Sequence, residues 1–178
     1  MTYALHLLDR ELHIDMVQLT SWHDFKGYSV EVSNLQTCPE WADTIASRAW
    51  NAWWTDSGVS LAEYRAHLDP MIEGEDIPLA LVAHKEGKYL GSVLLIENDL
   101  DDRPQYSPWI AALWVEPEVR RNGIAAKLME VARNEATKRG YGLCYLCATP
   151  DNSPYYLARG FEQIESDVSG LNIFTIRS

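Results

Sequence analysis

The sequence has few cysteines and no long apolar run. It contains three cysteines among 178 residues, Cys38, Cys144 and Cys147. An odd number of cysteines without a secretion signal makes a disulfide framework improbable. Charged residues interrupt the N-terminal region where a signal peptide would be apolar, and no run of about 18 apolar residues occurs. We therefore expect a cytoplasmic protein that does not span a membrane and keeps its thiols reduced.

Positive charge is also scarce. The chain has 15 lysines and arginines against 26 acidic residues, a net charge of -11. This balance argues against nucleic acid or an anionic membrane as the main partner, because both are polyanions. A cationic small molecule or a basic peptide suits the charge better, although an acidic surface often serves solubility alone. The length and a hydrophobic content of 47% predict a single domain over residues 1–178 with a sizeable core.

The apolar periodicity predicts a mixed sheet with helices on its faces. We expect, in order, a strand at 28–35, two helices, three strands, a helix after Gly123, a strand at 143–150, a short helix and a closing hairpin around Ser169. Thr37-x-x-Glu40 and Ser60-x-x-Glu63 have capping-box spacing and predict the first two helix starts, the second helix ending near Pro70. Residues 1–27 carry no clear pattern and form an extension of uncertain structure.

The turn before the predicted helix at Ile124 reads Arg120, Arg121, Asn122, Gly123, Ile124, Ala125. The first turn of a helix leaves N–H groups unpaired at the positive end of its dipole, where phosphate oxygens bind well. A glycine lets a pyrophosphate approach the backbone, and two arginines add charged donors. An ordinary strand-to-helix turn would explain the same residues.

Two motifs together resemble one family. Arg120-x-x-Gly123-x-Ala125 after an apolar strand is similar to the pyrophosphate loop of the GNAT superfamily of acyl-CoA-dependent N-acetyltransferases, and Tyr155 to Phe161 (YYLARGF) resembles its Tyr-x-x-x-Gly-Phe element. The element order agrees from about residue 28 to the C-terminus. The nucleotide-binding patterns G-x-G-x-x-G and G-x-x-x-x-G-K-[ST] are absent from the sequence. The resemblance implies an α/β (α+β) fold with a central, mostly antiparallel sheet, a splayed parallel pair and flanking helices.

The resemblance also implies a site for acetyl-CoA, with no metal. Backbone amides from Arg121 onward would hold the pyrophosphate, the pantetheine arm would lie between the splayed strands, and an N–H near Val115 would polarise the thioester carbonyl. The expected cofactor-binding residues are Leu113, Trp114, Val115, Arg120, Arg121, Asn122, Gly123, Ile124, Ala125, Ala126 and Asn152. Asn152 could instead be a helix cap, because position 149, where the family tends to carry an asparagine, is a threonine.

Tyr156 matches the family tyrosine that protonates the departing thiolate, in preference to Tyr155. A thiol has a pKa of about 8.5 and a phenol one near 10, so the phenol must lie close to the sulfur. The usual glutamate base is missing, since residues 107–115 and 142–149 contain no carboxylate. Glu97 is the preferred substitute for this base, and Asp99, Asp101 and Glu116 are the less preferred candidates. Direct entry of a neutral amine is the alternative.

Cys144 and Cys147 have the spacing of half a metal knuckle, but no second ligand pair follows, and in a strand the two thiols would point to opposite faces. We therefore favour packing of both side chains in the core over metal binding. The tryptophans of the first helix, Trp41, Trp50, Trp53 and Trp54, should form core and one wall of the acceptor pocket. Trp53 or Trp54 could instead mark a homodimer surface.

These observations predict an acetyl-CoA-dependent N-acetyltransferase in which a primary amine attacks directly in a ternary complex. Two acidic segments, residues 98–102 and residues 73–76, favour a cationic acceptor such as a polyamine, an aminoglycoside or a peptide amine. A non-catalytic acyl-CoA-binding regulator of the same fold is the alternative from another class. The sequence does not size the acyl pocket, so a longer acyl chain is also compatible.

Overall fold

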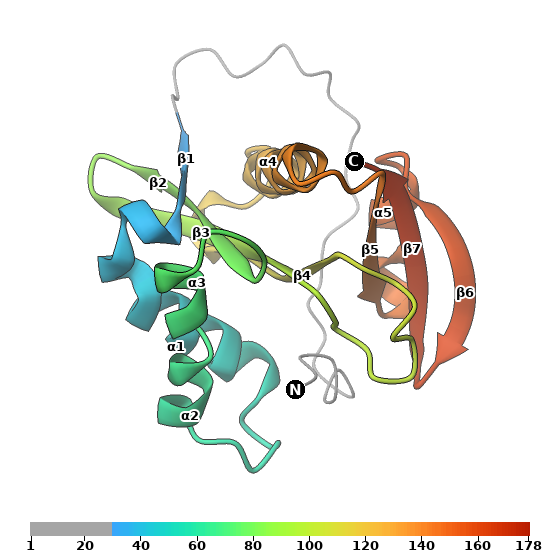
Figure 1. The fold of residues 1–178 in the computed structure, drawn as a ribbon, viewed down its shortest axis with the longest axis horizontal. Coiled ribbons are helices and arrows are strands. Elements are labelled where there is room, and N and C mark those ends of the chain that lie inside the picture. The colour runs from blue at the N-terminus through green and yellow to red at the C-terminus, as the bar shows by residue number, and fades with distance from the viewer. Residues whose placement is uncertain (1–29) are drawn as a thin grey trace.

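A computed structural model describes residues 30–178 of the chain (Figure 1); the extension at 1–27 lies outside this range. Within it the strands are β1 Glu31–Asn34, β2 Leu79–Lys85, β3 Lys88–Ile96, β4 Trp109–Val115, β5 Leu143–Ala148, β6 Glu162–Val168 and β7 Leu171–Arg177. They form one sheet in the order β1-β2-β3-β4-β5-β7-β6. Every neighbouring pair is antiparallel except β4 and β5.

The helices are α1 Ala42–Trp53, α2 Leu61–Ala66, α3 Asp69–Glu73, α4 Ile124–Lys138 and α5 Ser153–Leu157. Short 3-10 turns occupy Leu35–Thr37, Pro39–Trp41, Pro117–Val119 and Pro150–Asn152. The predicted fold class is thereby confirmed, and so is the predicted order of strands and helices, except that the second predicted helix is divided into α2 and α3. No helix of the described part is long and apolar enough to cross a membrane.

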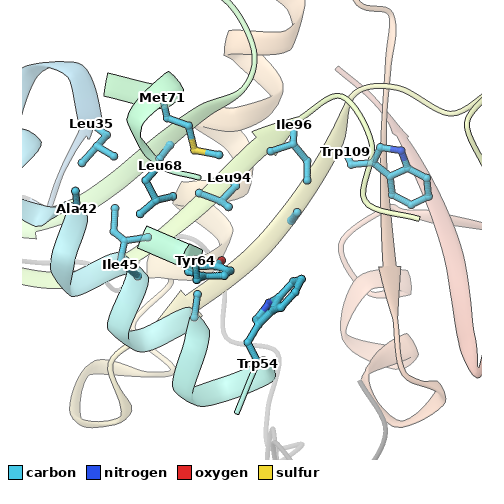
Figure 2. Packing of buried hydrophobic residues seen from close by; sticks show 14 of the residues in the cluster. Leu35, Ala42, Ile45, Trp54, Tyr64, Leu68, Met71, Leu94, Ile96 and Trp109 are labelled. Atoms are coloured by element: carbon cyan, nitrogen blue, oxygen red, sulfur yellow. The ribbon is translucent and has the colours of Figure 1, made fainter. Parts of the chain in front are cut away.

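The sheet separates two apolar cores, with α1 to α3 on one face and α4 on the other (Figure 1). The α1 face is filled by Tyr64, Leu94 and Trp109 among others, all fully buried (Figure 2). On the α4 face, Leu128, Ala132 and Ala136 fall along one side of α4 and pack onto strand residues such as Phe174. Cys144 belongs to the α4 face and Cys147 to the α1 face, which confirms that their side chains point in opposite directions.

The parallel pair is joined only at one end. Trp109 of β4 pairs with Tyr145 of β5, and Tyr145 N donates to Pro108 O at 2.9 Å. Beyond this point β5 continues along β7 while β4 follows β3, and the two strands part (Figure 1). The splayed pair predicted from the sequence is confirmed.

One of the two predicted capping boxes forms, and two other details of the helices differ from expectation. The Ser60 capping box forms, with Glu63 N donating to Ser60 Oγ and Ser60 N to Glu63 Oε2. The Thr37 box does not form, because the Thr37 hydroxyl donates back to Asn34 O and a 3-10 turn precedes α1. Pro70 does not end a helix but stands in the first turn of α3, where its missing N–H costs nothing.

Candidate active site

The segment between β4 and α4 contains two residues of positive φ, Arg121 at 64° and Gly123 at 74°. Closely spaced residues of this kind turn successive N–H groups toward one side of the backbone. Gly123 is the N-cap of α4, and no side-chain hydrogen bond caps the helix there. The N–H groups of the first turn and the positive end of the helix dipole can therefore receive an anion such as a pyrophosphate.

Arg120 and Asn122 hold this turn against the protein. Arg120 donates from Nε to Val115 O at 3.0 Å, and its guanidinium lies 5.1 Å from the centre of the Trp114 ring. Asn122 donates from Nδ2 to Val119 O at 3.2 Å. The structure thus brings the turn before α4 next to the end of β4. These are two of the three segments predicted to bind the cofactor, and their binding roles stay predictions.

The third predicted contact, Asn152, precedes α5. Its side chain makes no capping hydrogen bond to that helix, so the alternative role of Asn152 as a side-chain helix cap is wrong. The start of α5 is instead held by Ser153, which donates to Thr149 O at 3.2 Å and accepts from Asn172 Nδ2 at 2.9 Å.

A bulge interrupts β4 where it leaves β5. Leu94 pairs with Ala111 and Ser92 with Trp114, so β4 uses three steps where β3 uses two. Ala112, inside the bulge, has a φ of 47°. Bulges re-aim side chains and backbone next to active sites. The sequence carries no signal for this one, because the residues around it, Ala-Ala-Leu, include no glycine.

Tyr156 lies among aromatic rings on the α4 face of the sheet. Its ring centre is 5.6 Å from that of Phe161, 5.8 Å from Phe174 and 5.2 Å from Tyr155. Burial first, and then the nearby Tyr155 and Cys147, raise the pKa of the phenol well above its usual value. The neighbouring Tyr155 is engaged differently, with the Arg159 guanidinium 3.5 Å from its ring centre. Tyr156 therefore holds its proton throughout the neutral range, as a proton donor must.

The four carboxylates considered as a base have different surroundings. Glu97 and Asp101 are exposed, and Glu116 pairs with Arg48 at 2.5 Å. Asp99 is only 6% exposed and accepts a hydrogen bond from Cys147 Sγ at 3.3 Å. Burial raises the pKa of Asp99, and the hydrogen bond from Cys147 lowers it by less. The resulting pKa is about 6. Burial of a residue in a charged loop is not visible in the sequence.

The loop between β3 and β4 (residues 97–108) joins the two parts of the opened sheet. Arg103 Nε and Tyr106 Oη both donate to Glu165 of β6, at 2.8 Å and 2.7 Å. The Tyr106 ring stacks on Tyr145 of β5 with 4.7 Å between centres. With the contact from Asp99 to Cys147, these bonds fix the loop beside the gap between β4 and β5.

The tryptophans of the first predicted helix pack in or against the core, as expected, and their role as a wall of an acceptor pocket stays a prediction. Trp53 meets Trp114 of β4 edge to face, with ring centres 6.2 Å apart. Trp54 is 7% exposed and packs on Tyr64 within the core, so it does not mark a dimer surface.

The acidic segment at residues 73–76 lies far from the turn at the N-terminal end of α4. Asp76 pairs with Arg139 at 3.3 Å, at the C-terminal end of α4. A helix of 15 residues is about 22 Å long. Residues 73–76 therefore do not surround the gap, and of the two acidic segments only the β3–β4 loop adjoins it.

A sheet that opens beside an uncapped helix N-terminus suits a protein that binds a phosphate-bearing molecule. The chain matches the acetyltransferase (GNAT) family over residues 42–161, more than half its length, and it belongs to that family. Residues 30–178 contain no group of three or more histidine, cysteine or acidic side chains that could hold a metal ion.

Solved structures share the fold at low sequence identity. PaiA N-acetyltransferase from Thermoplasma acidophilum, in complex with coenzyme A, is 20% identical over 85% of this chain and 100% of its own, with a TM-score of 0.62. An aminoglycoside 6'-N-acetyltransferase complexed with coenzyme A is 17% identical over 83% and 96%, with a TM-score of 0.64. YncA from Salmonella typhimurium, with its cofactor acetyl-CoA, is 15% identical over 84% and 94%, also at 0.64. No curated protein matches the chain.

Proposed function

We propose that the protein is an acetyl-CoA-dependent N-acetyltransferase that transfers the acetyl group to a primary amine by direct attack in a ternary complex. The observation that carries this proposal is the opening of β4 from β5 beside the uncapped start of α4. Beyond Trp109 and Tyr145 the two strands do not pair with each other, so their main-chain groups can bond an extended pantetheine arm, and the start of α4 offers N–H groups to its pyrophosphate. Relatives of the same fold contain coenzyme A or acetyl-CoA, which supports acetyl-CoA as the co-substrate.

We assign the proton donor of this reaction to Tyr156. The amine nitrogen attacks the thioester carbonyl carbon, a C–N bond forms, and the negative charge on the carbonyl oxygen is stabilised by a main-chain N–H near Val115. The C–S bond then breaks, and the Tyr156 hydroxyl gives its proton to the departing thiolate. The phenolate takes back a proton from the nitrogen that becomes the amide.

We also infer a cationic acceptor. The net charge is -11, and the loop beside the gap carries the exposed carboxylates of Glu97, Asp101 and Asp102. Carboxylates around a cleft raise the local concentration of cations, and salt weakens the effect. Rates with a panel of cationic and neutral primary amines should favour the cations and fall with added salt; equal rates at all salt concentrations would exclude this acceptor class.

Calorimetric titration with acetyl-CoA tests the cofactor site. Asparagine and aspartate both tolerate the left-handed backbone of Gly123, so Gly123→Asn and Gly123→Asp differ mainly in charge. We expect Gly123→Asn to bind acetyl-CoA and Gly123→Asp to lose binding, since the carboxylate would repel the phosphates. Equal binding by the two variants would place the cofactor elsewhere.

Release of free thiol from acetyl-CoA in the presence of the amine panel tests catalysis. The native protein should release thiol with at least one amine, and Tyr156→Phe should slow this release about 100-fold or more while acetyl-CoA affinity stays the same. A native protein that binds acetyl-CoA and turns over no amine would instead be a non-catalytic acyl-CoA-binding regulator.

A further inference from the structure

Asp99 is the only buried carboxylate among residues 30–178. It forms no ion pair with any residue in that range, and its one hydrogen-bond partner is the weak donor Cys147 Sγ. An ionised carboxylate that is removed from water without a cation destabilises the fold by several kcal/mol. A group that carries such a cost beside an opening in a sheet is a candidate for function.

The position of Cys147 places Asp99 at the gap. Cys147 stands two residues after Tyr145, the residue of β5 that pairs with β4. It therefore lies on the part of β5 that β4 has left. The Cys147 side chain points to the α1 face, so Asp99 approaches β5 from that face.

Tyr156 reaches the same place from the other side. Its ring packs on Phe161 and Phe174, on the α4 face, and Phe174 of β7 follows Ile173, the residue that pairs with Cys147. Asp99 and Tyr156 thus lie on opposite sides of one residue at the gap. An acyl group held in this gap would have a proton donor on one side and a carboxylate on the other.

We propose that Asp99 is the general base that takes the proton from the incoming ammonium group, an inference that rests on the N-acetyltransferase function proposed above. The ammonium nitrogen gives one proton to Asp99 Oδ and becomes a neutral amine. That amine attacks the thioester, and the later steps run through Tyr156 as described. Asp99 then passes its proton to solvent, so one amide, one thiol and one solvent proton are formed from each ammonium and thioester.

The surroundings of Asp99 suit this role. Glu97 and Asp101 on its own loop are exposed, and Glu165 of β6 is occupied by Arg103 and Tyr106. Cys147 of β5 stays protonated, because burial and the nearby Asp99 raise the pKa of its thiol. Asp99 therefore faces no cation of the described chain, and its pKa of about 6 leaves it ionised at neutral pH yet able to accept a proton.

The test compares Asp99→Asn with Asp167→Asn, the same change at an exposed aspartate of β6, outside the β3–β4 loop. With a strongly basic amine, Asp99→Asn should lower kcat/KM about 100-fold or more, whereas Asp167→Asn should change it little. Calorimetric titration with acetyl-CoA confirms that each variant is folded. With amines whose pKa lies below the assay pH, which arrive already neutral, the loss in Asp99→Asn should largely disappear. A purely structural role would slow all amines equally, and that result would overturn the proposal.

The native protein supplies a test that needs no variant. For a strongly basic amine, kcat/KM should fall below about pH 6, where Asp99 becomes protonated, and should level off above it. If neutral amine enters without a base, kcat/KM instead rises continuously to the pKa of the amine, and this proposal fails. Loss of activity in Glu97→Gln with full activity in Asp99→Asn would also overturn it. Absence of turnover in the native chain would overturn the proposed function and this inference with it.

Discussion

Arg120 donates from Nε to Val115 O at 3.0 Å. This bond joins the turn before α4 to the last residue of β4, and the stacking of the same guanidinium on Trp114 strengthens the junction. The proposed pyrophosphate loop and the strand that borders the gap are therefore held in a fixed relation. An extended cofactor that touches both segments requires such a relation.

Arg120→Lys should weaken acetyl-CoA binding although it keeps the charge. Lysine cannot reproduce the planar group that bonds Val115 O and stacks on Trp114 at once. A lost hydrogen bond from a charged donor costs about 1.5 kcal/mol or more, so we expect the Kd for acetyl-CoA to rise about tenfold. Calorimetric titration measures it. An unchanged Kd in Arg120→Lys would mean that only the charge of Arg120 matters.

Cys147→Ala should move the acid limb of the pH–rate profile. The Cys147 hydrogen bond lowers the pKa of Asp99, so its removal should raise that pKa and shift the limb to higher pH. Cys147→Ser keeps a donor and should leave the limb near its native position. The profile of kcat/KM with a strongly basic amine measures both variants, and an identical limb in Cys147→Ala would separate Asp99 from the titration.

Asp99→Asn should stabilise the protein at neutral pH. The folded-state pKa of Asp99, about 6, lies above its ordinary value of 3.8, so the folded chain binds this proton more tightly than the unfolded chain. The stabilising contribution of the protonated form is complete below the ordinary pKa and is lost as pH rises through the folded-state pKa. Asparagine resembles the protonated form at every pH.

The stability advantage of Asp99→Asn over the native protein should therefore grow between about pH 4 and about pH 7, toward 2 to 3 kcal/mol as an order of magnitude. Urea unfolding at several pH values measures the difference. A constant difference for Asp99→Asn would show that Asp99 titrates normally.

Most of the fold followed from local patterns, and the missing parts depend on contacts between distant residues. The apolar repeat of α4, the Ser60 capping box and the Arg-x-x-Gly-x-Ala turn are local, and each appeared as expected. The bulge at Ala112 depends on the register with β3. The burial of Asp99 depends on the way its loop lies against β5. The sequence therefore favoured Glu97 as the base from its place at the end of the predicted hairpin, and it carried no sign that Asp99 is buried.

Glu165→Ala should weaken acceptor binding without changing acetyl-CoA binding. Glu165 accepts hydrogen bonds from both Arg103 and Tyr106, and these bonds hold the β3–β4 loop, which carries Asp99, beside the gap. Without Glu165 the loop should be less ordered, so KM for the amine should rise several-fold and kcat should fall.

The matched control for Glu165→Ala is Glu162→Ala, an exposed position on the same strand. It should leave the kinetic constants of both substrates unchanged. The Kd for acetyl-CoA should stay at the native value in both variants, because the turn before α4 is held by Arg120 and Asn122 and not by β6. If Glu165→Ala weakened acetyl-CoA binding as much as amine binding, the loop would be supporting the whole opened sheet and not the acceptor side alone.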